Sequence, residues 1–291
     1  DSDMAKKLRI RNHRVVLNRS RGGDVGITVL LFILGIFMFL PMWYLIITAL
    51  KPLGERNITP PNLYVIKPTM QNFIDLFSNM NSTWVPISRY IFNTIIISVA
   101  ATFGCLVLGS LTAYALSKIK FPGRTWIFAV IRYSLMISST IAGITNFFIF
   151  VWLGWLNTYW ISIVPVWAST LGLYLMKQFI DSSVSDEMIE AARIDGAGEL
   201  RIYWQIVMPL VKPAWLTLLV TTFQTVWNSG ASVYVWSEQL KTFNSAIATI
   251  GTVSAGASSA GSVVMMSVPI IIFIVNQAKI VETMGSSGMK D

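Results

Sequence analysis

Long uncharged runs separated by short charged segments dominate this chain. The uncharged runs are Val25 to Leu50, Tyr90 to Ser117, Tyr133 to Met176, Pro213 to Ser237 and Thr242 to Ala278. About 20 apolar residues cross the hydrocarbon core of a bilayer as one helix. The third run is long enough for two such helices, joined by a turn at Gly154 to Thr158. The pattern therefore predicts six spans, at about 25–50, 90–117, 125–152, 159–180, 213–236 and 260–280.

Composition agrees with this pattern. Hydrophobic residues make up 54% of the 291 residues and charged residues only 12%, which indicates an all-α integral membrane protein rather than a soluble domain. The predicted organisation is a basic N-terminal arm over 1–24, a six-helix membrane domain over 25–280 and a C-terminal tail over 281–291. Residues 181–212 form the longest charged connection within the second half of the membrane domain.

The basic residues predict the orientation. Most Lys and Arg residues lie in the N-terminal arm, in the connections around 118–124 and 181–212, and after the last span. Because basic residues concentrate on the cytoplasmic side of membrane proteins, both termini and the 181–212 connection are expected in the cytoplasm. The net charge of +8 is then a consequence of topology, and nucleic-acid binding is not needed to explain it.

The 181–212 connection carries signals for two short helices. Ser185 can cap a helix that begins with acidic residues and that ends at Gly196, which predicts a helix over 186–194. A second helix is expected over 199–207, until Pro209 breaks it. Small side chains at Ala191 and Ala192 would let another protein approach the backbone. An ordinary amphipathic connector on the membrane surface is the alternative interpretation.

The spacing within this connection resembles a known family motif. Glu190-Ala191-Ala192, Gly196, Ile206 and Pro209 fit E-A-A-x3-G-x9-I-x-L-P, with Met208 at the Leu position. The pattern resembles the EAA loop of the membrane subunits of ATP-binding-cassette importers, which receives force from ATPase subunits. The resemblance implies an ATPase-coupling site, made of Glu190, Ala191, Ala192, Asp195, Gly196, Ile206, Met208 and Pro209.

Several missing features argue against other mechanisms. All acidic residues lie in predicted loops or termini, whereas proton-coupled carriers usually need a titratable group inside the membrane. No G-x-x-x-x-G-K-[ST] loop is present, so ATP hydrolysis is expected in another subunit. Cys105 and His13 are the only residues of their types and make poor metal or catalytic candidates. A secondary carrier or a membrane-embedded enzyme is therefore disfavoured, and no metal or cofactor is expected in this chain.

Further segments narrow the resemblance to a carbohydrate-importer permease of the maltose-transporter type. They are Arg89-Tyr90-Ile91-Phe92-Asn93-Thr94, Leu156-Asn157-Thr158, the pair Pro269 and Gln277, and the ending Val281 to Lys290. The ending resembles a branch that imports polysaccharide-derived oligosaccharides, some of them acidic. The resemblance implies a bacterial inner-membrane complex with a second permease, two ATPase subunits that bind ATP and Mg, and an extracytoplasmic binding protein. An importer for a non-sugar solute remains the alternative.

A sugar pathway has two sequence candidates. Gln224, Trp227 and Asn228 share one helical face and offer amide groups and an aromatic surface. Hydrogen bonding between helices uses the same residue types, so the two interpretations stay open. Arg132 is the one charge well inside a predicted span, and it either faces a hydrated cavity or an anionic sugar, or extends to the cytoplasmic surface.

Overall fold

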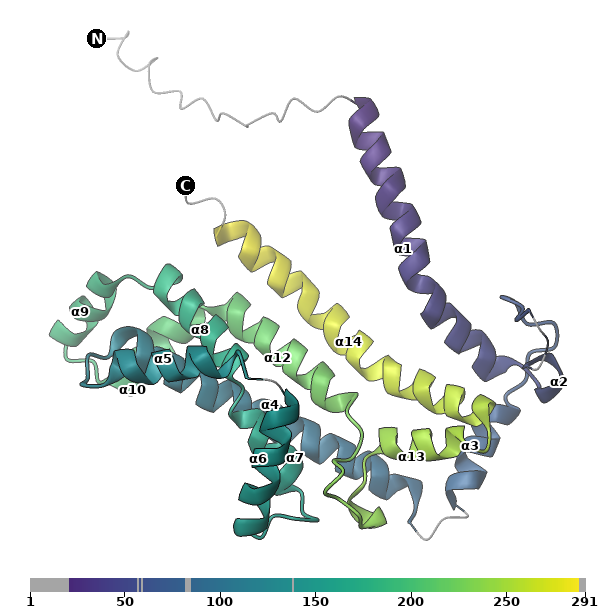
Figure 1. Cartoon of the computed structure of the whole chain (residues 1–291). Helices are drawn as coiled ribbons and strands as arrows, with labels where there is room; N and C mark the ends of the chain where they lie inside the picture. Colours follow the sequence, from purple (N-terminus) through teal and green to yellow (C-terminus); the bar gives the residue numbers. More distant parts are fainter. Residues whose placement is uncertain (1–20, 57, 59, 82–84, 138, 288–291) are drawn as a thin grey trace.

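A computed structural model describes residues 21–56, 58, 60–81, 85–137 and 139–287, and every regular element in these ranges is helical (Figure 1). The elements are α1 (Arg21–Leu50), α2 (Leu53–Arg56), α3 (Gln71–Asn81), α4 (Ile87–Lys118), α5 (Arg124–Ser134), α6 (Ser139–Trp152), α7 (Trp160–Trp167), α8 (Thr170–Ser183), α9 (Asp186–Ile194), α10 (Glu199–Ile202), the π-helix η1 (Tyr203–Val207), α11 (Met208–Leu210), α12 (Lys212–Trp227), the 3-10 helix η2 (Glu238–Leu240), α13 (Phe243–Gly251) and α14 (Ala255–Ser287).

Four helical stretches in the described part of the chain are long and apolar enough to cross a membrane. They are Gly23–Leu50, Ile87–Lys118, Trp160–Ser183 and Ala255–Asn276. A fifth is possible if Glu199–Leu210 and Lys212–Trp227 count as one span, although these two pieces meet at an angle of 82°. The all-helical membrane class is confirmed for the described residues, while the structure itself contains fewer uninterrupted spans than the six predicted.

The predicted span at 125–152 is divided into α5 and α6. The hydroxyl of Ser134 donates a hydrogen bond to the carbonyl of Ile131 at 2.7 Å. The next backbone bond runs from the N–H of Met136 to the carbonyl of Tyr133 at 3.0 Å, which is a tighter turn than an α-helix makes. Serine side chains that bond to nearby carbonyls bend helices. The uniformly apolar sequence had suggested one continuous helix here.

The predicted span at 213–236 is also shorter than expected. α12 ends at Trp227, and an irregular segment over 228–242 follows, which we call the 228–242 segment. It begins with Asn228, Ser229 and Gly230, which favour turns over helix. The chain then forms the additional short helix α13, and α14 begins at Ala255 instead of near 260.

α4 lies at the centre of the packing and contacts α7, α8, α12 and α13. Its approach to α7 requires a glycine, because a Cβ at Gly104 would lie 2.0 Å from Nε1 of Trp167. That indole donates instead to the carbonyl of Ala100 at 3.0 Å. One apolar core surrounds the α9 end of α4, with Tyr114 and Ile202, and a second surrounds its other end, with Tyr90 and Trp227.

α1 stands apart from this bundle along most of its length. α1 and α14 meet near α3 and spread apart toward the opposite end of the molecule (Figure 1). Only the last turns of α1 are anchored: Ile47 and Ala49 are buried, and Nδ2 of Asn72 donates to the carbonyls of Ala49 and Lys51 at 2.8 Å. The residues from 25 to 40 are exposed.

Candidate functional site

Helix α9 is capped at both ends by its own sequence. The N–H of Met188 donates to the hydroxyl of Ser185 at 3.3 Å, which satisfies one free backbone donor of the first turn. At the other end, Gly196 has a φ of +79°. The N–H of Ala197 reaches the carbonyl of Ala192, and the N–H of Gly196 reaches that of Arg193, both at 3.0 Å. This is a Schellman cap, and the predicted helix over 186–194 is confirmed.

The second predicted helix of the connection is also present, with a wider middle turn. α10, η1 and α11 follow one another from Glu199 to Leu210, and η1 has π-helical bonding over Tyr203–Val207. The chain then bends by 82° before α12 begins at Lys212. Pro209 and Pro213 flank this bend, and each removes a backbone donor. Together these residues form a helix-turn-helix segment over 181–212, which we call the EAA segment.

The motif residues divide into a buried and an exposed group. Ala192 and Met208 are buried in the chain's own core, and Ile206 packs against it. Glu190, Ala191, Asp195, Gly196 and Pro209 are exposed. The expectation that Ala192 offers surface to another protein therefore needs correction, because its methyl group packs within the chain.

Two exposed apolar side chains beside the motif escaped the sequence argument. Ile194 is 86% exposed and Leu200 is 69% exposed, and both belong to the same helix-turn-helix segment as Ala191. Large apolar groups left open on a surface mark interaction sites when they gather. Neither side chain was singled out from the sequence, because helical spacing alone does not say which apolar residues stay exposed.

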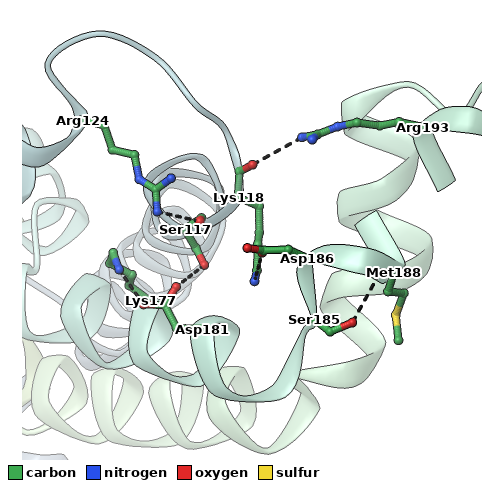
Figure 2. A network of polar contacts seen from close by, with 9 residues as sticks. All are labelled: Ser117, Lys118, Arg124, Lys177, Asp181, Ser185, Asp186, Met188 and Arg193. Atoms are coloured by element: carbon green, nitrogen blue, oxygen red, sulfur yellow. Dashed lines mark hydrogen bonds and ion pairs between the residues drawn. The ribbon is translucent and has the colours of Figure 1, made fainter. Parts of the chain in front are cut away.

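A polar network ties the EAA segment to the end of α4, as Figure 2 shows. Nζ of Lys118 lies 2.7 Å from Oδ1 of Asp186, and Nζ of Lys177 lies 2.5 Å from Oδ2 of Asp181. The hydroxyl of Ser117 donates to the other oxygen of Asp181. Lys118 lowers the pKa of the Asp186 carboxyl through this hydrogen bond. The network holds α4, α8 and α9 together at one end of the molecule.

Glu199 connects α10 with α9 and α4. Its Oε1 accepts from Nε of Arg193 at 2.7 Å, and its Oε2 accepts from the hydroxyl of Tyr114 at 2.6 Å. The hydrogen bond from Arg193 lowers the pKa of Glu199 and outweighs the opposing effect of burial. Nη2 of Arg193 also reaches the carbonyl of Lys118 at 3.4 Å.

A cavity of about 500 Å³ lies between α1, α12, α13 and α14. Its polar lining comes from Gln224, Asn228, Asn244 and Ser262, and its apolar lining is Met42, Met265, Met266, Pro269, Ile270 and Phe273. Amide and hydroxyl groups beside apolar surface suit a polar, uncharged group with an apolar face. Asn244 and Ser262 were not identified from the sequence, because they belong to helices far along the chain.

Trp227 does not line this cavity. Its side chain is 7% exposed, its ring stacks on Phe223 with centroids 5.3 Å apart, and its Nε1 donates to the carbonyl of Met265 at 2.9 Å. The shared helical face of Gln224, Trp227 and Asn228 is thus split: the two amides border the cavity and the indole packs against α14.

Arg132 is exposed on α5, with its guanidinium 5.9 Å from the ring centre of Tyr133. It is not among the residues that border the cavity. In the described part of the chain, no three His, Cys, Asp or Glu side chains gather in a way that could hold a metal ion.

The 228–242 segment is fastened to the opposite end of α4. Nδ2 of Asn93 donates to the carbonyls of Gln239 and Lys241, both at 2.8 Å, and the hydroxyl of Tyr90 donates to Oε1 of Glu238 at 2.9 Å. Oδ1 of Asn157 accepts from the N–H of Ser237 at 2.9 Å. Tyr90, Asn93 and Asn157, from the sequence segments 89–94 and 156–158, therefore hold the 228–242 segment.

Helices of membrane length, with a helix-turn-helix segment projecting from one end, define a polytopic membrane protein. Residues 24–279 match the family described as "Binding-protein-dependent transport system inner membrane component", and the chain belongs to this family. It is therefore an inner-membrane transport component, and its relatives are permeases rather than enzymes.

Individual relatives cover most of the chain. It is 28% identical over 252 residues to the sn-glycerol-3-phosphate transport system permease protein UgpE of Yersinia enterocolitica, with 84% of each chain covered. It is 26% identical over 276 residues to the melibiose/raffinose/stachyose import permease protein MelC of Bacillus subtilis, covering 91% of this chain and 96% of that protein.

A solved structure has the same fold. It is described as a bacterial ABC transporter involved in the import of the acidic polysaccharide alginate, and one of its chains matches with a TM-score of 0.71 at 22% identity. The match covers 90% of this chain and 98% of the other.

Proposed function

We propose that this chain is one permease subunit of an ATP-driven importer that moves an oligosaccharide across the inner membrane. The observation that carries the proposal is the EAA segment, with its capped α9 and with Ala191, Ile194 and Leu200 exposed on it. A surface of this kind suits a groove on a partner ATPase, which would bind ATP and Mg. Glu190, Asp195, Gly196 and Pro209 complete the contact, while Ala192, Ile206 and Met208 support it from within.

The proposed topology has six spans with both termini in the cytoplasm. α5 and α6 together form the third span, α7 and α8 the fourth, and α12 the fifth. The EAA segment then lies in the cytoplasm, and the 228–242 segment lies on the outer side with α3 and α13. The distribution of Lys and Arg supports this orientation.

The partners follow from the same proposal. A second permease would cover the exposed length of α1 and close the cavity that Gln224 and Asn228 border. A binding protein would deliver solute to the outer face, as the alginate transporter was also solved with an alginate pentasaccharide-bound periplasmic protein. The polar lining of the cavity and the likeness to MelC favour a sugar as the cargo. The likeness to UgpE favours glycerol phosphate as the second candidate.

Uptake into membrane vesicles that contain the complete transporter tests both candidates. We expect ATP-dependent accumulation of a labelled oligosaccharide, either from the raffinose series or from alginate, when its binding protein is present. Glycerol phosphate should not compete. Accumulation of glycerol phosphate alone would replace the sugar assignment, and uptake that persists without ATP would overturn the importer mechanism.

A further inference from the structure

Two buried tyrosines of α4 make the same arrangement at opposite ends of the helix. Tyr90 and Tyr114 are 2% and 3% exposed, and both donate their hydroxyl to a glutamate outside α4. They stand 24 positions apart in one uninterrupted helix, which is about 36 Å at 1.5 Å per residue. This length is similar to the thickness of a membrane.

Each glutamate divides its two oxygens in the same way. Oε1 of Glu238 accepts from Tyr90 at 2.9 Å, and its Oε2 lies 2.6 Å from Nζ of Lys241. Oε2 of Glu199 accepts from Tyr114 at 2.6 Å, and its Oε1 accepts from Nε of Arg193 at 2.7 Å. The cation keeps the carboxylate ionised, and an ionised acceptor makes a stronger bond to the tyrosine.

Further bonds reinforce each end and involve different residues. At the outer end, Nδ2 of Asn93 holds two carbonyls of the 228–242 segment, and Oγ1 of Thr94 accepts from the N–H of Phe243 at 2.8 Å. At the inner end, Lys118 pairs with Asp186 at 2.7 Å. α4 is one uninterrupted α-helix from Ile87 to Lys118, so a displacement of one end is passed to the other through its backbone hydrogen bonds.

We propose that α4 is a strut whose two tyrosine–glutamate clamps connect the EAA segment with the 228–242 segment. Tyr90 and Tyr114 are its positioning residues. A displacement of α9 moves Glu199 and therefore α4, and the far end of α4 moves Glu238 and the outer segment with it. In the opposite direction, docking of a loaded binding protein displaces the 228–242 segment, and α4 passes this displacement to the EAA segment and so to the ATPase. The inference rests on the importer function proposed above.

Removing single hydroxyl groups tests the strut with little disturbance of packing. The variants are Tyr90→Phe, Tyr114→Phe and the double variant, with Tyr64→Phe as the control because Tyr64 is 60% exposed. Each is made in the complete transporter, together with its binding protein, and assembly yield, melting temperature, ATP hydrolysis and uptake per intact complex are measured.

We expect each single variant to lose about tenfold in the stimulation of ATP hydrolysis by loaded binding protein, since a bond to a charged group shifts an equilibrium by about that factor. Because the two clamps act in series, breaking both should interrupt the same path as breaking one. The double variant should therefore retain as much stimulation of ATP hydrolysis as the more impaired of the two single variants. Uptake per ATP should fall in parallel, with normal assembly yield and with Tyr64→Phe unchanged.

Three results would overturn the strut. Losses that multiply in the double variant would make the clamps independent, and losses that track melting temperature would make them merely stabilising. Normal stimulation of ATP hydrolysis in both single variants would show that the clamps do not transmit motion. These outcomes are separate from a failure of the importer function, which would appear as absent ATP-dependent uptake in the unaltered transporter.

Discussion

At the scale of single residues, Gly196 controls the geometry of the EAA segment. Its φ is +79° and no atom lies within 4 Å of the position that a Cβ would take, so a side chain there strains the backbone without a clash. We expect Gly196→Leu to cost about 1–2 kcal/mol of stability at the α9 cap and to reduce ATP-driven uptake. Thermal melting and uptake of the assembled transporter measure both effects.

Gly196→Asn is the matched control, because asparagine tolerates left-handed backbone better than leucine does. It should retain most of the stability and uptake. If Leu and Asn behave alike, the backbone conformation at this position does not matter for coupling.

The buried indole of Trp227, bonded to the carbonyl of Met265, predicts a role in the fold rather than in the pathway. Trp227→Ala removes a buried indole and leaves the carbonyl of Met265 without its donor, which should cost about 3–5 kcal/mol. Uptake per intact complex should stay normal while yield and melting temperature fall. Trp236→Ala is the control, because Trp236 is 64% exposed and should have little effect. A Trp227→Ala complex with normal melting temperature but without uptake would instead indicate that Trp227 contacts the transported solute.

The residues that sequence reasoning placed well are those whose structure is local. Ser185 and Gly196 define the ends of α9 through hydrogen bonds that span three to five positions. Trp227 shows the limit of the same reasoning. Helical spacing put it beside Gln224 and Asn228, but its direction depends on α14, some 38 residues along the chain. Ala192 was misjudged for the same reason, because its burial depends on packing against other elements.

At the scale of elements, the junction of α9, α10 and α4 depends on an ionised Glu199. Its pKa is lowered by the hydrogen bond from Arg193, so the ionised form stabilises the fold above the ordinary glutamate pKa of 4.5. This contribution is lost as pH falls through the lower value of the folded state. We therefore expect Glu199→Gln to be less stable than the unaltered protein at neutral pH.

The difference in melting temperature between Glu199→Gln and the unaltered transporter should shrink as the pH falls below 4.5. Melting curves recorded from neutral pH downward would measure it. Glu190→Gln is the control from the same segment when all curves are recorded without the ATPase subunits, because Glu190 is exposed there and should show little difference at any pH. A gap for Glu199→Gln that is constant with pH would contradict the proposed pairing.

Hydropathy predicted where helices lie but not where they break. The interruption between α5 and α6 falls at a tight turn in an otherwise apolar run, where the N–H of Met136 bonds to the carbonyl of Tyr133. The end of α12 at Trp227 leaves room for the 228–242 segment, which α4 holds from a distant part of the sequence. Window averages do not register such bonds, so the fifth span was expected to be longer than it is.

At the scale of the whole molecule, the proposed function assigns ATP hydrolysis to partner subunits. It contains no phosphate-binding loop of the G-x-x-x-x-G-K-[ST] type, and we expect no ATP hydrolysis above background when it is purified alone. Adding the ATPase subunits and the second permease should restore activity. An active enzyme made only of this polypeptide would contradict the proposal.

The exposed length of α1 affects how a copy without its partner permease behaves in the membrane. Lipid tails solvate an apolar helix about as favourably as apolar protein does. The hydrophobic effect therefore does not drive α1 to pack against the rest of the chain within the bilayer. A copy without its partner permease should therefore stay dispersed in the bilayer and not aggregate as an orphaned soluble subunit would. On the proposed function, an unpaired copy would then remain available to a partner permease that is made later.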